Sequence, residues 1–243
     1  MTTPTKLLML GSGEVGRRCA ALLGDAPGLE VTTDEPGAAL TDLDQVLGDH
    51  QLVALVTERP SPAVAKILDE RCWSGNIPWI QAELCGHQFR VGPTVVPPTT
   101  PCWECLQRRL RSLVVDQPAH QATQAAAESE PSEPWFAGQL GALTEQVAAL
   151  TAIQCINMSS GRYAPRADGM GQYWEGDAVF GILRQRRFAR IGLCPRCAPQ
   201  DPRASFERAA RWFGQRFVAK ELASRTEPVD EWRPQAGEKP RPS

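Results

Sequence analysis

Two cysteine pairs far apart in the chain constrain its fold more than any other feature. Each pair is a Cys-x-x-Cys beside prolines, at Cys102 and Cys105 and again at Cys194 and Cys197. Two such turns can place four thiolates around one Zn²⁺ at about 2.3 Å, in a tetrahedron. The pairs are separated by 88 residues, against the roughly 15–20 of a self-contained zinc ribbon. The pattern therefore predicts a zinc clasp that joins two distant segments of one domain.

Four sulfur ligands leave no open position on the metal, so this zinc would be structural rather than catalytic. Two redox-active pairs or four free thiols are the alternatives. The chain has eight cysteines and no secretory signal, which favours bound metal in a reducing cytoplasm over disulfides. We expect the other four cysteines to fill the core; they are Cys19, Cys72, Cys85 and Cys155.

The overall composition excludes several classes of function. A net charge of −2 provides no basic field for nucleic acid. No apolar stretch approaches the roughly 18 residues of a membrane span. With 243 residues, 42% of them hydrophobic and 22% charged, the chain is typical of a soluble globular protein with one large domain or two small ones. We expect a cytoplasmic protein that binds neither nucleic acid nor membrane.

A glycine-rich motif follows the first apolar run of the chain. The run at 6–10 is typical of a buried strand, a helix is expected at 17–23, and between them lies Gly11-Ser12-Gly13-Glu14-Val15-Gly16, which we call the glycine loop. A strand, such a loop and a helix form the context in which dinucleotides bind, because backbone N–H groups and a helix N-terminus receive phosphate. Occupancy by a nucleotide is a separate question. The glycines can equally serve close packing of strand on helix, and Glu14 places a carboxylate near any bound anion.

The next segments alternate between strand and helix patterns. Strands are predicted at 29–33, 52–57 and 77–82, with a helix at 62–74. This alternation predicts an α/β domain with a parallel core. The segment 89–96 predicts an antiparallel addition to that sheet, and 169–191 predicts two or three further strands that lead to the second cysteine pair.

The remaining segments complete the predicted organisation. Residues 116–134 carry no large apolar side chain and predict a mobile crossover. A helix is expected from 135 to 158, because Leu140, Leu143, Val147 and Leu150 form one apolar face that belongs to the core. We thus expect one domain over 1–200 that contains the crossover, an amphipathic helix at 201–225 and a disordered tail at 226–243.

Three passages, taken in chain order, resemble the ThiF/MoeB superfamily of ubiquitin-activating-enzyme-like adenylating proteins. They are the glycine loop, the second cysteine pair and, leading into the first pair, Val91-Gly92-Pro93-Thr94-Val95-Val96-Pro97. The last passage is most similar to the ThiF-like, or cyclodehydratase C-protein, branch of azole-forming and thiopeptide-type pathways. In that branch the protein serves a YcaO-type cyclodehydratase by holding the leader peptide of the precursor. The resemblance implies a Rossmann-like ThiF-type domain with a mixed sheet, paired as a homodimer.

The chain departs from the adenylating members at the residues that act on ATP. Asp34 matches their ribose-binding acid, although a solvated turn explains it nearly as well, and Glu58 stands where they hold Mg²⁺ with Asp. Residues 35–56 contain no Lys or Arg, where the family has a phosphate-binding arginine and a catalytic lysine. Loss of one such cation costs about 10²–10³ in rate. We therefore predict a vestigial nucleotide site, without ATP and Mg²⁺ as working cofactors, at Gly11, Gly13, Gly16, Asp34 and Glu58.

These features favour a non-catalytic scaffold that binds a leader peptide, a YcaO-type cyclodehydratase, or both. The alternative is an ATP-dependent enzyme that adenylates a peptide or sulfur-carrier carboxylate. A nicotinamide-dependent oxidoreductase is disfavoured, because no Tyr-x-x-x-Lys and no suitable histidine are present. The winged-helix module common in leader-binding members is not found in this sequence. A separate polypeptide would then supply leader recognition, or this chain does so by strand addition to an exposed sheet edge.

Overall fold

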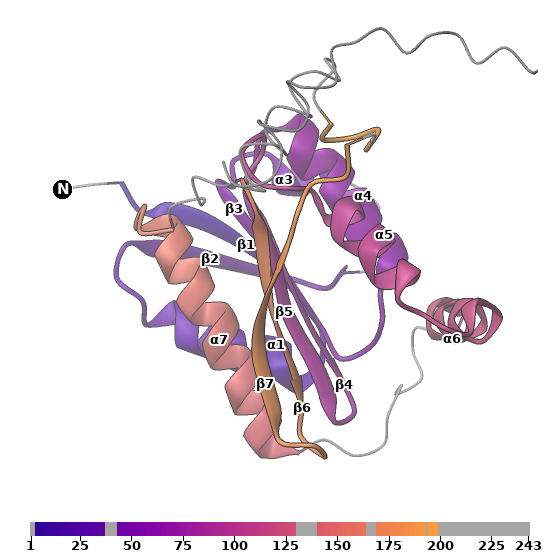
Figure 1. The fold of residues 1–243 in the computed structure, drawn as a ribbon. Coiled ribbons are helices and arrows are strands. Elements are labelled where there is room, and N and C mark those ends of the chain that lie inside the picture. Colours follow the sequence, from indigo (N-terminus) through magenta and orange to yellow (C-terminus); the bar gives the residue numbers. More distant parts are fainter. Residues whose placement is uncertain (1–2, 37–42, 130–139, 164–168, 193, 199–243) are drawn as a thin grey trace, which may run out of the picture. The chain divides into compact units, whose positions relative to one another are not determined.

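A mixed sheet of seven strands organises the part of the chain that the computed structural model describes, which is residues 3–36, 43–129, 140–163, 169–192 and 194–198. The strand order is β2-β1-β3-β4-β5-β6-β7 (Figure 1). The first four strands are parallel and the last three continue antiparallel. They are β1 (Thr5–Gly11), β2 (Leu29–Asp34), β3 (Leu52–Thr57), β4 (Trp79–Cys85), β5 (Gln88–Val95), β6 (Gly171–Asp177) and β7 (Ile182–Phe188). The predicted α/β class, mixed sheet and antiparallel addition are confirmed.

Helices cover both faces of the sheet, which explains the apolar strand runs. Every residue of β3 is buried, as expected for a central parallel strand with helices on either side. On one face lie α1 (Gly13–Gly24) and α7 (Gly141–Ser159). On the other lie α3 (Leu43–Leu47), α4 (Pro62–Ser74) and α5 (Trp103–Ser112) (Figure 1). Cys19, Cys72 and Cys155 are buried in these two cores as predicted, and Cys85 is half-buried at the end of β4.

Helix α6 (Gln117–Ser129) lies within the predicted crossover over 116–134, where no helix was expected; residues 130–134 lie outside the described part of the chain. The prediction rested on the lack of large apolar side chains, which indicates only that no face of the segment is buried. The segment is nevertheless rich in Ala and Gln, which have high helix propensity. The side chain of Asp116 accepts a hydrogen bond from the N–H of Ala119 at 2.9 Å and thereby caps the helix. Local propensity and a cap thus form a helix where packing gives none.

Helix α7 confirms most of the predicted apolar face but begins later than expected. Leu143 and Val147 are buried, and Leu150 packs partly buried against the same core. Leu140 is 55% exposed, contrary to its predicted core position, because it precedes the first helical residue and does not share the face of the helix. The segment 169–191 contains two strands, β6 and β7. The predicted helix at 201–225 and tail at 226–243 lie outside the described residues.

None of the helices in the described part of the chain is long and apolar enough to cross a membrane.

Two glycines decide how closely α1 approaches the sheet. A Cβ added to Gly16 would lie 3.0 Å from the Cα of Gly11, and one added to Gly11 would lie 3.2 Å from the Cα of Gly16. Both contacts are with backbone, which cannot yield as a flexible side chain does. The glycines therefore let β1 and α1 pack backbone against backbone.

We predict that Gly16→Ala lowers the free energy of unfolding by about 1–3 kcal/mol, because the added methyl group must push α1 away from β1. Gly24→Ala is the matched control. A Cβ there meets nothing within 4 Å, so it gains helix propensity and should leave stability equal or slightly higher. Urea unfolding midpoints of the two variants measure the difference. Equal midpoints would show that the close approach is not required.

Candidate functional site

The residues predicted to form sites lie at opposite edges of the sheet. The glycine loop follows β1, Glu58 follows β3 and Asp34 ends β2, so all are at the carboxyl edge of the parallel strands. Open α/β sheets bind ligands at this edge. Cys102 instead follows β5, whose last residue, Val95, pairs with the first residue of β4. The zinc clasp therefore belongs to the amino edge, away from the glycine loop.

At the glycine loop, the carboxylate of Glu58 occupies the place where an anion would bind. Its Oε1 accepts a hydrogen bond from the backbone N–H of Val15 at 2.8 Å. Gly13, the first residue of α1, has a φ of +70°, and a Cβ there would lie 2.0 Å from Glu58 Oε2. A helix N-terminus favours negative charge, since its first N–H groups lack partners. Here the chain supplies that charge itself.

The other predicted residues of this edge are engaged locally. The pairing register sets Asp34 beside Leu10, just before the glycine loop. Its Oδ1 accepts a hydrogen bond from the N–H of Glu35 at 2.8 Å, the bond of a simple turn. The two arginines that follow the loop also have acidic partners. Arg17 pairs with Glu14, and Arg18 Nε lies 2.6 Å from Oε1 of Glu145 on α7.

The structure brings the four predicted cysteine ligands together. All four thiols are buried, and their sulfur atoms lie within 4.8 Å of one another. The separations are 3.8 Å for Cys102–Cys105, 3.5 Å for Cys102–Cys194 and 3.3 Å for Cys105–Cys197. Sulfur atoms at the corners of a zinc tetrahedron are about 3.8 Å apart. The donor set and its spacing therefore fit one Zn²⁺ with no position left for a substrate.

Crowding of the sulfurs separates the pKa values of the thiols. A hydrogen bond with Cys102 lowers the pKa of Cys194 and that of Cys197. The hydrogen bond with Cys105 helps to raise the pKa of Cys102. Zinc binds thiolates, so the metal would displace the protons that these shared hydrogen bonds hold. Binding of zinc would therefore release protons from the cluster.

Arg190 joins the two halves of the clasp, a role the sequence analysis missed. Its guanidinium donates to the carbonyl of Cys197 at 2.7 Å, and to the carbonyls of Pro98 at 2.8 Å and Thr100 at 3.0 Å. The N–H of Ile191 also donates to Cys105 Sγ at 3.3 Å. Such outer contacts orient ligands and balance the charge of a thiolate site. No local pattern marks Arg190, since two of its acceptors, Pro98 and Thr100, are about 90 residues away.

A buried carboxylate supports the same region. Asp69 of α4 accepts hydrogen bonds from the N–H of Trp103 at 3.1 Å and from Trp79 Nε1 at 3.3 Å. Burial raises the pKa of Asp69 to about 6. Arg196, between the second pair of cysteines, offsets that cost with an ion pair, its Nε 2.9 Å from Asp69 Oδ2. The position of Arg196 between Cys194 and Cys197 was the sequence feature that could have indicated its contact with Asp69.

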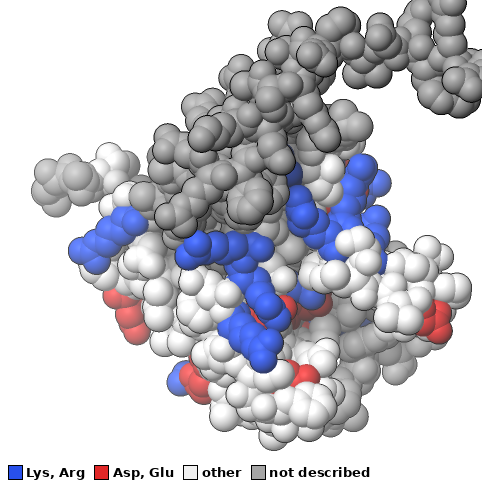
Figure 2. All heavy atoms as spheres, viewed as in Figure 1, with Lys and Arg blue, Asp and Glu red and all other residues white. Residues whose placement is uncertain are grey.

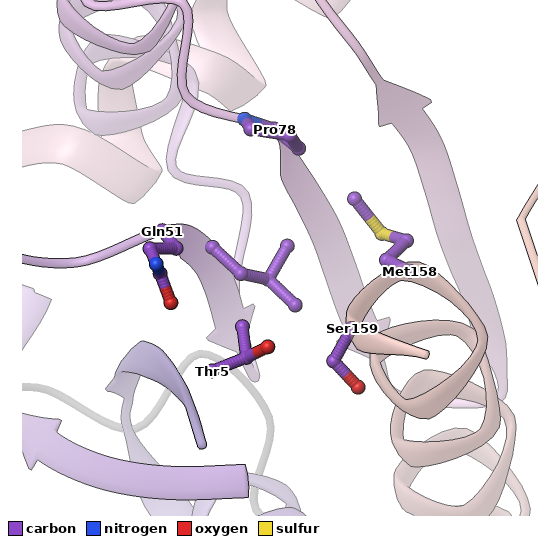
Figure 3. A pocket seen from close by; sticks show the side chains of 6 residues that line it. Thr5, Gln51, Pro78, Met158 and Ser159 are labelled. Carbon is purple, nitrogen blue, oxygen red and sulfur yellow. The ribbon is translucent and has the colours of Figure 1, made fainter. Parts of the chain in front are cut away.

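A shallow pocket of about 150 Å³ opens at the amino edge of the sheet (Figure 3). It lies beside the end of α7. The side chains that line it include no ionisable group; they are Thr5, Gln51, Leu52, Pro78, Met158 and Ser159. The pocket therefore offers no acid or base that could activate the hydroxyls of Thr5 and Ser159, and it is at the edge where open α/β sheets do not bind their ligands.

Comparison with known proteins identifies the fold. No protein-family model and no curated protein matches the sequence. Among solved structures, the heterocyclase TruD superposes with a TM-score of 0.58 at 19% identity, over 81% of this chain and 28% of that one. A heterocyclase in complex with substrate and cofactor superposes with a TM-score of 0.59 at 18% identity, over 80% of this chain and 26% of that one. MccB of E. coli superposes with a TM-score of 0.57 at 15% identity, over 81% of this chain and 66% of that one. This chain shares their fold.

The matches cover different shares of these proteins. The chain spans about a quarter of the length of the two heterocyclases and about two thirds of that of MccB. MccB has also been solved with AMPCPP and MccA, and that structure superposes with a TM-score of 0.56 at 14% identity. The Rossmann-like α/β architecture inferred from the motifs is thus one that solved structures share. What those proteins bind is a property of their own chains.

We predict that the purified protein contains one zinc per chain, and that Cys102→Ser loses it and melts roughly 10 °C lower, because a buried four-ligand site cannot close with three sulfurs. Elemental analysis and thermal unfolding measure both effects. Cys85→Ser, outside the cluster, is the control and should keep the metal. A Cys102→Ser protein that retains zinc and melts like the parent would rule out the clasp.

We predict that Arg196→Met destabilises the protein by about 3 kcal/mol, because it leaves the charge of Asp69 buried without its cation. Arg71→Met removes an ion pair of similar length, 3.1 Å to Asp44, but both of its side chains are more than half exposed. It should cost less than about 1 kcal/mol. Denaturant unfolding of the two variants compares them directly, and equal losses would contradict the structural role assigned to Asp69.

Proposed function

We propose that this chain is a non-catalytic, ThiF-like partner protein in the biosynthesis of a ribosomally made peptide natural product. It holds the leader segment of the precursor, the YcaO-type cyclodehydratase that modifies it, or both, and it works as a homodimer. The sequence motifs and the fold shared with a heterocyclase and with MccB support this class of role. The zinc clasp contributes stability to the fold rather than chemistry.

The position of Glu58 is the observation that carries the non-catalytic part of the proposal. In a nucleotide-binding loop the helix N-terminus meets phosphate. In this chain a carboxylate already accepts the N–H of Val15, and a triphosphate would have to displace that negative charge. The glycines have a second explanation in the contact between β1 and α1, so their presence does not require a nucleotide.

The cations near the loop point the same way. Stabilising charge on a transferring phosphoryl or adenylyl group requires positively charged groups placed beforehand. Arg17 and Arg18 are instead paired with Glu14 and Glu145. Residues 35–56, from the end of β2 through most of β3, contain no Lys or Arg. The two arginines that directly follow the loop are thus paired with carboxylates, whereas an adenylating site needs free cations there.

Adenylation of a peptide or sulfur-carrier carboxylate is the second candidate function. It is favoured by the shared fold with MccB, which has been solved with AMPCPP. In that case Glu58 would have to leave Val15 and hold Mg²⁺, while Asp34 held the ribose. The two candidates differ in one measurable property, the binding and turnover of ATP.

We predict that the zinc-loaded protein shows no ATP–pyrophosphate exchange with candidate peptides, and no binding of Mg-ATP by calorimetry at micromolar concentrations. Glu58→Ala removes the resident carboxylate and should allow weak ATP binding without exchange, because the cations for catalysis are still lacking. Co-purification with a YcaO-type enzyme or a precursor peptide is the expected positive result. Micromolar ATP binding with exchange in the parent protein would replace the scaffold with the enzyme.

A further inference from the structure

The free edge of β7 is the surface with the clearest capacity to bind a partner. β7 is the last strand of the sheet, and no described strand pairs with its outer side. It pairs with β6 over seven consecutive residues without a register shift, so it is long, regular and free of a bulge. It contains no proline. Natural proteins usually interrupt such an edge, because its unpaired backbone groups can add another strand.

The edge is strongly basic. Arg184, Arg186 and Arg187 lie within its seven residues, which include no acid. Arg186 pairs with Glu175 at 2.6 Å, whereas Arg184 and Arg187 make no ion pair with any described residue. Successive strand residues alternate between faces, so these two arginines project to opposite sides of the sheet. Figure 2 shows Lys and Arg side chains gathered along the middle of this face of the molecule, over β7.

Apolar side chains lie next to this charge. In the turn between β6 and β7, Val179 and Phe180 are 67% and 74% exposed, and Leu183 of β7 is 47% exposed. The turn is held in place by Asp177, whose Oδ1 accepts the N–H groups of Val179 and Phe180 at 3.0 and 3.3 Å. Its Oδ2 accepts Gln88 Nε2 of the neighbouring hairpin at 2.8 Å. The apolar tip is thus presented by a fixed turn.

The charge on this edge selects its occupant. Two copies of β7 paired edge to edge would bring arginines of one chain beside arginines of the other, and like charges on adjacent strands are destabilising. An extended segment with acidic side chains meets the opposite situation, because each of its carboxylates can approach Arg184 or Arg187 while the backbones pair. An apolar residue of the segment can cover the turn.

We propose that β7 binds an extended acidic polypeptide segment by strand addition, with Arg184 and Arg187 contacting its carboxylates and Phe180 and Leu183 contacting one apolar side chain. The proposal rests on the proposed function, for which it names the peptide-binding surface and the chemistry of the peptide. The segment becomes the eighth strand of the sheet. Binding weakens with salt, since both of the arginines are exposed.

The test uses the full zinc-loaded chain and two short synthetic peptides, one of repeated Glu-Glu-Val, which places carboxylates and an apolar side chain on both faces of an added strand, and the other with Lys in place of Glu. Fluorescence anisotropy measures affinity, and amide hydrogen exchange reports where the peptide binds. We expect the acidic peptide alone to bind and to slow exchange within 182–188. The double variant Arg184→Glu/Arg187→Glu should weaken it by about tenfold or more and favour the Lys peptide instead.

Arg17→Glu/Lys66→Glu is the matched control, because it changes the net charge equally at exposed helix positions of α1 and α4. It should leave affinity within about twofold. Equal loss of affinity in both double variants would overturn the proposal, and so would slowed hydrogen exchange outside 182–188. Self-association that is lost only in Arg184→Glu/Arg187→Glu would also overturn it, because the edge would then bind a second copy of the chain. If the peptide does not bind but a complex with the cyclodehydratase still forms, only the assignment of the peptide to β7 is wrong. ATP–pyrophosphate exchange would instead rule out the proposed scaffold function.

Discussion

The contact among four buried sulfur atoms is the constraint on which the antiparallel half of the sheet depends. One pair of cysteines begins α5, directly after β5, and the other follows β7. Their meeting fixes the two ends of the antiparallel extension at the amino edge. Tyr173 and Phe188 pack in the same small cluster. A sheet edge that relied on strand pairing alone would fray, so the sulfur cluster is what makes β7 a defined surface.

In the parallel half of the sheet, the carboxylate of Glu58 accepts a backbone N–H at the start of α1. In nucleotide-binding relatives of this architecture, a ligand supplies negative charge at that position. Here an acidic side chain supplies it, and two glycines let strand and helix meet backbone to backbone. The fold can therefore be complete without a small molecule. The proposed scaffold function rests on this combination: the architecture is kept, and residues 35–56 contain no Lys or Arg.

Much of the fold could be predicted because its signals are local. The buried runs of β1 and β3, the helix at 62–74 and the spacing of the cysteine pairs each specify their own structure from adjacent residues. The start of α1 was placed too late, at 17, because the glycine loop itself forms the first turn from Gly13. Helix α6 was missed because it has no apolar face, although Asp116 supplied a cap signal.

The site was only partly predictable, for a related reason. The four candidate metal ligands share a fixed short spacing, so the pattern identified the cysteines that the structure brings together. Arg190 and Asp69 act through contacts with residues distant in the chain, and neither has a characteristic neighbour. Glu58 was placed correctly after β3, but its partner, the N–H of Val15, lies 43 residues away. Sequence spacing can indicate which residues carry chemistry, but long-range packing determines what each one contacts.

The resident carboxylate at the glycine loop has a consequence for how the cell sets the amount of folded protein. A chain that binds a nucleotide only when folded gains about 2.7 kcal/mol at a ligand concentration of one hundred times its Kd. Under the proposed scaffold function, Glu58 keeps that position and mass action of this kind does not operate. The folded fraction would then be independent of the adenylate pool, and starvation for energy would not by itself expose the chain to proteolysis.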